Sequence, residues 1–266
     1  KERTILKAAD SSSWTATGGN YTIDNGVITV SNNTSKNSGF FITDQYDTLG
    51  DYTVSVSAIG TRGFPMERET DIGVVPWYID NNNYILVYMN WSNSDRPSEL
   101  REIQITGRIN GKALVIKNGS SWTQKEWNDH WTDGMAVKEN STNTIKVSKI
   151  RSASKDSDII KVTVNDTISA SLEVRDTLQF DHMKAKVGVY GYDDTITFSN
   201  FVFEKEAIVS QFKNIGDGIG RSENGSLSYN EGKYTIDASS SSDMFSNIAL
   251  LKNANATGGY DVIADF

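Results

Sequence analysis

The chain has 266 residues and a formal net charge of -8 at pH 7. Its length suits one large β domain, or one domain with part of another, and its negative charge argues against nucleic acid or an anionic membrane as a partner. The absence of cysteine excludes a disulfide framework and a thiolate metal site, and no apolar run reaches the roughly 20 residues that a membrane-spanning helix needs.

Short segments of alternating apolar and polar residues follow one another along the chain and predict β-strands. In chain order they are 26–32, 51–60, 76–91, 101–109, 143–150, 159–166, 186–192 and 195–204. Turn-forming pairs such as Asn165-Asp166 and Asp193-Asp194 separate them. Many short strands with this punctuation predict an all-β fold, an antiparallel two-sheet jelly-roll sandwich. The one candidate helix is 122–131, where a short turn within a long loop is the favoured interpretation.

A segment near the start of the chain is repeated near its end. Gly232 matches Gly26 and Tyr260 matches Tyr52 at nearly the same offset, and the apolar positions between them correspond. We therefore predict one complete module over residues 1–205, followed by the truncated start of a second, similar module over residues 206–266. Chance similarity between two low-complexity β segments is the alternative.

The segment 76–91 and the strand 101–109 are predicted to form two successive hairpins, and side chains on a strand alternate between faces. The predicted opposite pairs are Tyr78–Tyr84, Pro76–Leu86, Tyr84–Arg108, Leu86–Thr106, Tyr88–Gln104 and Asn90–Glu102. Odd-numbered positions are almost all apolar and predict the face that packs against the other sheet. These positions are Val75, Trp77, Ile79, Ile85, Val87, Met89, Trp91, Ile103, Ile105 and Ile109.

Even-numbered positions of the same strands combine tyrosine rings with hydrogen-bonding groups, which is how proteins hold a neutral polyhydroxylated ligand. The candidate ligand-binding residues on this face are Tyr78, Tyr84, Tyr88, Asn90, Glu102, Gln104 and Arg108. An ordinary solvated sheet face is the alternative, since tyrosine and threonine are good strand formers.

The tryptophan-rich segment 122–131 is a second candidate platform for a ligand. It places Trp122, Trp127, His130 and Trp131 in the predicted long loop, where exposed rings are costly unless they bind something. The alternative is a lid whose rings plug the open end of the sandwich. No metal-ligand spacing surrounds His130 or the other histidine, His182.

Catalysis and calcium binding receive weaker support from the sequence. Glu67, Glu69 and Asp71 alternate along one extended segment, but hydrolysis of a glycoside needs two carboxylates across a cleft, and a solvated lip is the favoured interpretation, so no catalytic residue is predicted. Oxygen-rich turns could hold a structural calcium. The candidate turns are 80–83, with Asp80, Asn81, Asn82 and Asn83, and 193–194, with Asp193 and Asp194, although β-turn chemistry explains both.

Three segments, "GDYTVSVSA", "IGVVPWYIDNNNYILVYMNW" and "KVGVYGYDDTITFSNFVFE", together resemble the concanavalin A-like lectin/glucanase superfamily in its laminin-G-like bacterial branch. The resemblance covers most of residues 1–205. It implies a jelly roll with a concave face that often carries glycan, in modules placed beside glycoside hydrolase domains of secreted bacterial enzymes. The glucanase branch carries a Glu-x-Asp strand motif. In "ERETD" the acidic residues Glu67, Glu69 and Asp71 do not follow the order of that motif.

Residues and resemblance together predict a non-catalytic carbohydrate-binding module of a secreted, multimodular bacterial protein, extracellular or on the cell surface. Its expected partners are a poly- or oligosaccharide and neighbouring domains of the same polypeptide. A spacer or adhesion module without glycan binding is one alternative, and a glycoside hydrolase acting through Glu67 and Glu69 is another.

Overall fold

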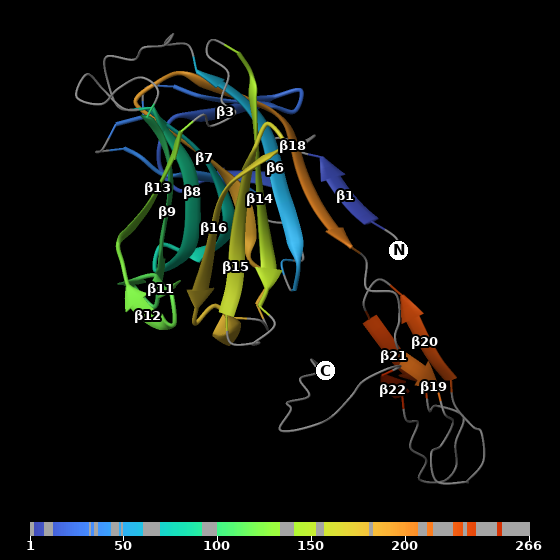
Figure 1. Cartoon of the computed structure of the whole chain (residues 1–266). Coiled ribbons are helices and arrows are strands. Elements are labelled where there is room, and N and C mark those ends of the chain that lie inside the picture. The colour runs from blue at the N-terminus through green and yellow to red at the C-terminus, as the bar shows by residue number, and fades with distance from the viewer. Residues whose placement is uncertain are drawn as a thin grey trace. The chain divides into compact units, whose positions relative to one another are not determined.

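The computed structural model contains two antiparallel sheets that face each other, and no α-helix among the residues that it describes (Figure 1). The structure describes residues 3–7, 13–31, 33–34, 37–43, 48, 50–60, 70–91, 100–133, 141–152, 157–180, 183–206, 212–214, 226–230, 233–237 and 249–251. By its contacts the chain divides into two compact units, residues 4–205 and residues 206–266 with 1–3. The predicted all-β sandwich is confirmed in the larger unit.

Sheet 1 has ten strands in the order β12-β11-β16-β15-β14-β6-β18-β4-β3, and β1 pairs with β18. Its strands are β1 (Arg3–Lys7), β3 (Tyr21–Asp24), β4 (Val27–Val30), β6 (Tyr52–Gly60), β11 (Val115–Asn118), β12 (Ser121–Gln124), β14 (Asn143–Arg151), β15 (Ser157–Val164), β16 (Thr167–Arg175) and β18 (Ile196–Glu206). Strands far apart in sequence are neighbours here, because β6 lies between β14 and β18.

Sheet 2 has eight strands in the order β10-β9-β8-β7-β17-β5-β2, and β13 also pairs with β9. Its strands are β2 (Trp14–Ala16), β5 (Phe40–Thr43), β7 (Thr70–Asp80), β8 (Asn83–Trp91), β9 (Leu100–Ile109), β10 (Lys112–Ala113), β13 (Trp127–Asp133) and β17 (Lys186–Tyr192). The sequence predicted a short turn within a long loop at 122–131, and this prediction is wrong. The segment forms two strands, β12 and β13, that belong to different sheets.

The hydrophobic core lies between the two sheets and is built by strand alternation. On β6, for example, Tyr52, Val54, Val56 and Ala58 are buried while the residues between them are half-buried. Burying a large apolar side chain contributes on the order of 1.5 to 3 kcal/mol. The odd-numbered face predicted for β8 and β9 is confirmed, since its described members all belong to this core; they are Ile85, Val87, Met89, Ile103, Ile105 and Ile109.

The predicted pairing of β8 with β9 is confirmed at every position, whereas the pairing of β7 with β8 is right only near the turn. Tyr78 lies opposite Tyr84, but the register shifts between Val74 and Trp77. The predicted pair Pro76–Leu86 is therefore wrong, and the predicted core position Val75 lies in a cluster on the other face of sheet 2. A β-bulge of this kind exchanges the two faces of the strand upstream of it.

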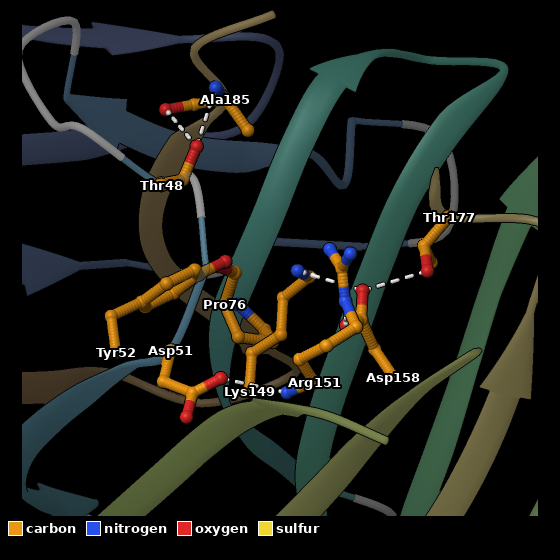
Figure 2. Close-up of polar contacts among 9 residues, drawn as sticks. All are labelled: Thr48, Asp51, Tyr52, Pro76, Lys149, Arg151, Asp158, Thr177 and Ala185. Carbon is orange, nitrogen blue, oxygen red and sulfur yellow. Dashed lines mark hydrogen bonds and ion pairs between the residues drawn. The ribbon is translucent and has the colours of Figure 1, made fainter. Parts of the chain in front are cut away.

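Proline explains where the bulge lies. Pro76 has no N–H to donate to a central ladder, so proline inside a sheet is confined to edges and bulges. The carbonyl oxygen of Pro76 accepts a hydrogen bond from the Tyr52 hydroxyl of sheet 1, at 2.6 Å (Figure 2). The bulge thus also links the two sheets.

A buried charged cluster lies on β14 and β15 of sheet 1 (Figure 2). The Asp158 carboxylate is fully buried and accepts bonds from Lys149 Nζ at 2.7 Å, Arg151 Nε at 2.9 Å and Thr177 Oγ1 at 2.7 Å. Burial alone would raise the pKa of Asp158, but these donors outweigh it and hold that pKa below its ordinary value. This carboxylate is saturated by the protein's own groups, so its role is structural.

The second unit contains two small antiparallel pairs: β19 (Phe212–Asn214) with β22 (Ala249–Leu251), and β20 (Ser226–Asn230) with β21 (Lys233–Asp237). The hairpin β20–β21 ends in the pair Asn230–Lys233, and the hairpin β3–β4 ends in Asp24–Val27. The two hairpins share this register when Gly232 is aligned with Gly26, which is compatible with the predicted repeat. The division into modules stays a prediction.

Candidate functional site

A second apolar cluster covers the face of sheet 2 that points away from sheet 1, which we call the outer face. Its members come from β5, β7, β8 and β17 of that sheet; they are Ile42, Val75, Tyr78, Leu86 and Tyr88, with Phe40, Tyr84 and Tyr190 packed against them. A cavity of about 370 Å³ opens on this face. The face is hollowed and aromatic, which is typical of a ligand-binding surface.

Four aromatic side chains line the cavity in a continuous arc. The ring centroid of Phe40 lies 5.0 Å from that of Tyr84 and 5.8 Å from that of Tyr190. Tyr190 in turn lies 6.2 Å from Tyr88. These ring pairs are tilted or edge-on rather than stacked, which is a favourable geometry for neighbouring aromatic rings.

The floor of the arc depends on a glycine in β7. Gly73 lies opposite Tyr88 on one side and opposite Tyr190 on the other. A Cβ atom at Gly73 would lie 2.9 Å from the Cβ of Tyr88, closer than packed side chains tolerate. Glycine is therefore required for these neighbouring strands to carry the two tyrosines side by side.

Polar groups supply most of the remaining described cavity wall, beside Leu86 and Gly39. Asp71 of β7, Asn81 of the β7–β8 turn and Thr106 of β9 line it, together with Thr17 and Ser38 from the loops that flank β2 and β5. Asp71 is the one carboxylate among the described lining residues, and it is 8% exposed. Hydroxyl, amide and carboxylate groups around apolar rings can orient a ligand that carries many hydrogen-bonding groups.

Burial is the main influence on the pKa of the lining tyrosines Tyr84 and Tyr190. Burial, and after it the negative charge of Asp71, raise the pKa of Tyr190 far above its ordinary value. Burial also raises the pKa of Tyr84, and Arg108 partly offsets this shift. Both hydroxyls therefore stay protonated at neutral pH and can donate as well as accept hydrogen bonds.

The predicted residues of the even-numbered face separate into lining residues and supporting residues. Tyr84 and Tyr88 line the cavity. Tyr78 is buried outside the lining, where its ring packs edge-on against Phe40 and its hydroxyl donates to Asn81 Oδ1 at 3.0 Å. Gln104 supports the wall, because Gln104 Oε1 accepts a hydrogen bond from the Tyr88 hydroxyl.

Arg108 is a neighbour of the cavity rather than part of its described lining. Its guanidinium pairs with Glu126 at 2.9 Å and donates to the carbonyl oxygen of Gly111 at 3.1 Å. Asn90 and Glu102 lie opposite each other at the far ends of β8 and β9, and their side chains lie outside the described part of the structure.

The predicted tryptophan platform is divided between the two sheets. Trp122 lies on β12 of sheet 1, where Arg175 Cζ is 5.0 Å and Lys117 Nζ is 5.9 Å from its ring centroid. Trp127, His130 and Trp131 lie on β13 beside β9, and only their backbone placement is described. The four residues therefore do not form one surface.

Two aromatic lining residues, Phe40 and Tyr190, were not predicted from the sequence. Tyr190 alternates within the strand 186–192, but the sequence does not say that β17 lies between β7 and β5. Asp71 had been noted only as one of three alternating carboxylates, and the other two, Glu67 and Glu69, lie outside the described residues. Pairing between strands more than a hundred residues apart leaves no local signal.

The oxygen-rich turns show turn chemistry rather than an assembled metal site. Asp80 Oδ1 accepts hydrogen bonds from the Asn82 N–H at 2.8 Å and from Asn83 Nδ2 at 2.9 Å. Asp194 Oδ1 accepts one from the Thr195 N–H at 2.6 Å. Within the described residues, no three histidine or acidic side chains are grouped as metal ligands would be. No calcium ligand set is therefore assigned.

The comparisons with known proteins bear on the fold. No protein-family model and no curated protein sequence matches the chain. The metal-free exoplasmic/lumenal domain of VIP36 matches with a TM-score of 0.50 and 11% identity, over 77% of this chain and 92% of that domain. The CBM2 module of the evolved Dit of Lactobacillus casei BL23 phage J-1 matches with a TM-score of 0.46 and 11% identity, over 76% and 95%.

The likeness to the VIP36 domain shows the class of fold. The larger unit is a concanavalin A-like jelly-roll sandwich, as the sequence resemblance implied. At 11% identity the likeness concerns the fold alone. Among the described residues, no helix has the length and hydropathy needed to cross a membrane.

Proposed function

We propose that this protein is a non-catalytic carbohydrate-binding module that holds a poly- or oligosaccharide in the cavity on the outer face of sheet 2. The observation that carries the proposal is the arc of Phe40, Tyr84, Tyr88 and Tyr190 around about 370 Å³. Sugar rings present apolar C–H faces and a rim of hydroxyls, so aromatic rings and nearby polar groups complement them.

The proposed site extends from the cavity along β9 toward β13. The backbone register places Trp127 opposite Thr106, a lining residue, and Trp131 opposite Glu102. Residues directly opposite in an antiparallel pair belong to the same face of the sheet. We therefore include Trp127 and Trp131 in the proposed site. His130 pairs with the core residue Ile103, so we leave it out.

Affinity electrophoresis in gels that contain soluble polysaccharides tests the proposal. We expect at least one polysaccharide to retard the protein, and Tyr84→Ala to weaken the retardation, because Tyr84 is a half-buried lining ring. Trp122→Ala is the matched control, since it removes an aromatic ring from sheet 1. If no glycan retards the wild type, the spacer or adhesion module becomes the better interpretation.

The wider setting of the module is part of the same proposal. We infer that this is an extracellular module of a secreted, multimodular bacterial protein that also carries a polysaccharide-degrading domain. The internal repeat and the shared register of hairpins β3–β4 and β20–β21 support the multimodular organisation. Binding measured with calcium and with a chelator tests whether a structural calcium contributes. Hydrolysis of a retained glycan that is lost in Glu67→Gln would replace this proposal with a glycoside hydrolase.

A further inference from the structure

We propose that Tyr21, on β3 of sheet 1, is a positioning residue of the binding site, because its hydroxyl fixes the two peptide units that carry Phe40 and Tyr190. This inference rests on the proposed glycan-binding function and adds a residue from outside the described lining of the cavity. Tyr21 holds two lining rings at a fixed separation and does not itself touch the ligand.

The Tyr21 hydroxyl bonds to two segments of sheet 2. It donates to the Gly39 carbonyl oxygen at 2.6 Å and accepts a hydrogen bond from the Gly191 N–H at 3.2 Å. Gly39 precedes Phe40, the first residue of β5, and Gly191 follows Tyr190 in β17. Each of the two bonded groups therefore belongs to a peptide unit whose other end is a lining residue.

The hydroxyl takes the place of a missing backbone partner in the ladder between β5 and β17. The described pairing of these strands ends at Tyr190–Phe40, so Gly191 has no partner residue on β5 within it. Backbone groups inside a protein need another partner in such a place. Tyr21 accepts from the Gly191 N–H, and Asn33 Nδ2 donates to the Gly191 carbonyl oxygen at 3.1 Å. Two side chains thus hold the residue that follows Tyr190.

The peptide unit before Phe40 is held at both ends. Its carbonyl oxygen, that of Gly39, accepts the bond from Tyr21, and its N–H donates to Thr17 Oγ1 at 2.8 Å. The Phe40 carbonyl oxygen also accepts a hydrogen bond from the Thr17 N–H at 2.8 Å. Because a peptide unit is planar, bonds at both of its ends restrict the direction in which the Phe40 side chain leaves the backbone.

Packing and protonation suit Tyr21 for this role. Its ring stacks on that of Phe41, with a centroid distance of 5.3 Å and an interplanar angle of 7°. Phe41 belongs to the core between the sheets, so the Tyr21 ring is anchored there. Burial raises the pKa of Tyr21 far above its ordinary value, so its hydroxyl stays protonated at neutral pH and can donate and accept at once. Phenylalanine at this position would keep the ring contact and lose both bonds.

The consequence for binding is preorganisation. The ring centroids of Phe40 and Tyr190 lie 5.8 Å apart, and both rings line the cavity. They come from strands that join sheet 2 through distant segments, so no hairpin turn sets their separation. A saccharide that meets rings already in place does not have to order them, and this saved entropy increases its affinity.

Affinity electrophoresis of Tyr21→Phe tests the inference. The probe is whichever of soluble xylan, β-glucan, galactomannan and starch retards the wild type most strongly. We expect Tyr21→Phe to bind about fivefold more weakly, because the ligand must then order one or two rings. Tyr52→Phe is the matched control, since it removes another hydroxyl that donates to a carbonyl oxygen, that of Pro76, outside the described lining. It should lower stability and leave the affinity unchanged.

A double-variant cycle with Tyr190→Leu separates positioning from a general effect on folding. Once the Tyr190 ring is removed, the Tyr21 hydroxyl has only the Phe40 ring left to position. Tyr21→Phe should therefore weaken the affinity by a smaller factor in the Tyr190→Leu background than in the wild type. Equal factors in the two backgrounds would mean that Tyr21 does not act through the Tyr190 ring, and would overturn the inference.

NMR on the ligand-free protein gives a readout that needs no saccharide. In the wild type, the Gly191 amide should be protected from hydrogen exchange, and the ring protons of Phe40 and Tyr190 should show a nuclear Overhauser effect. Both signals should weaken in Tyr21→Phe, while amides of β14 and β15 stay protected. An unprotected Gly191 amide in the wild type overturns the inference even if Tyr21→Phe does not fold.

The outcomes separate this inference from the proposed function. Unchanged affinity of Tyr21→Phe overturns the inference and leaves glycan binding in place, whether or not the contact between the Phe40 and Tyr190 rings changes. If no polysaccharide retards the wild type, the proposed function is wrong, and the NMR measurement alone decides whether Tyr21 positions the two rings.

Discussion

Asp158 and Asp71 are both buried aspartates on central strands, but their surroundings differ. Asp158 is enclosed on sheet 1 by Lys149, Arg151 and Thr177, which donate to both of its oxygens (Figure 2). Asp71 lies at a cavity on the outer face of sheet 2, among aromatic rings. Asp158 is thus neutralised by cations of its own sheet, whereas Asp71 belongs to the wall of a cavity.

This difference separates the structural charged cluster of sheet 1 from the proposed binding face of sheet 2. A saturated buried ion pair is costly to disturb but presents nothing to a ligand. A carboxylate among aromatic rings in the wall of a cavity is a candidate ligand-binding group. Substitutions in the sheet 1 cluster should therefore lower the free energy of unfolding, and substitutions of lining residues on sheet 2 should mainly lower ligand affinity.

The largest effect is expected from Asp158→Asn. This change leaves Lys149 and Arg151 without their common counter-ion, and Lys149 is itself almost fully buried. Breaking a buried pair from one side costs about 3 to 5 kcal/mol. Urea unfolding should show that loss, while glycan affinity of the folded fraction stays unchanged. In the double variant with Lys149→Met, the loss should be smaller, and an equal loss would contradict the ion-pair explanation.

Acid should weaken the same cluster. The contacts with Asp158 lower its pKa in the folded state, so the charged form contributes stability above the unfolded value of about 3.9, and this contribution is lost as the pH falls through the lower folded value. The free energy of unfolding of the wild type should therefore fall more steeply than that of Asp158→Asn below about pH 4. Glu173, whose pKa is also lowered, is present in both proteins, so the difference isolates Asp158.

Tyr52→Phe tests the link between the sheets at the β7 bulge. The variant keeps the buried ring and removes the hydroxyl that donates to the Pro76 carbonyl oxygen. A buried carbonyl left without a donor costs about 1 to 3 kcal/mol. Urea unfolding measures the loss. Tyr21→Phe is the comparison, because its hydroxyl also donates to a carbonyl, that of Gly39, but lies outside the bulge. A stability equal to that of the wild type would mean that another group satisfies Pro76.

The sequence predicted the parts of the site that depend on neighbouring strands. Alternation within 84–108 assigned Tyr84 and Tyr88 to one face and Ile85 and Val87 to the other, and the register of β8 with β9 is as predicted. Hairpins are local, so turn position and alternation are enough to determine them. The bulge in β7 had a local signal too, because proline in a central strand requires one.

The rest of the site depends on contacts between distant segments. Phe40 and Tyr190 reach the cavity only because β5 and β17 follow β7 in sheet 2, an order that no local pattern determines. Asp71 lines the cavity because the bulge exchanges the faces of β7. Trp122 was grouped with Trp127 by sequence proximity, but the chain crosses from sheet 1 to sheet 2 between them.

A smaller effect, on binding rather than folding, is expected at Tyr190. Tyr190→Leu removes a ring of the arc and should lower glycan affinity about tenfold, equivalent to about 1.4 kcal/mol. Tyr190→Phe keeps the ring and should bind nearly as tightly as the wild type, provided that ring contact rather than the hydroxyl holds the ligand. Calorimetry on both variants separates the two contributions. Equal affinities of Leu and Phe variants would show that the ring is not part of the site.

The smallest effect is expected from Arg108→Ala, which removes an ion pair at the surface together with the hydrogen bond to the Gly111 carbonyl oxygen. The side chains of Arg108 and Glu126 are 38% and 46% exposed, so water already solvates both charges. Exposed pairs contribute about 0 to 1 kcal/mol, and salt screens them. Urea unfolding of this variant should show a loss within that range that shrinks in high salt, unlike the loss in Asp158→Asn. A loss as large as that of Asp158→Asn would show that contact with a counter-ion, rather than burial, determines the cost.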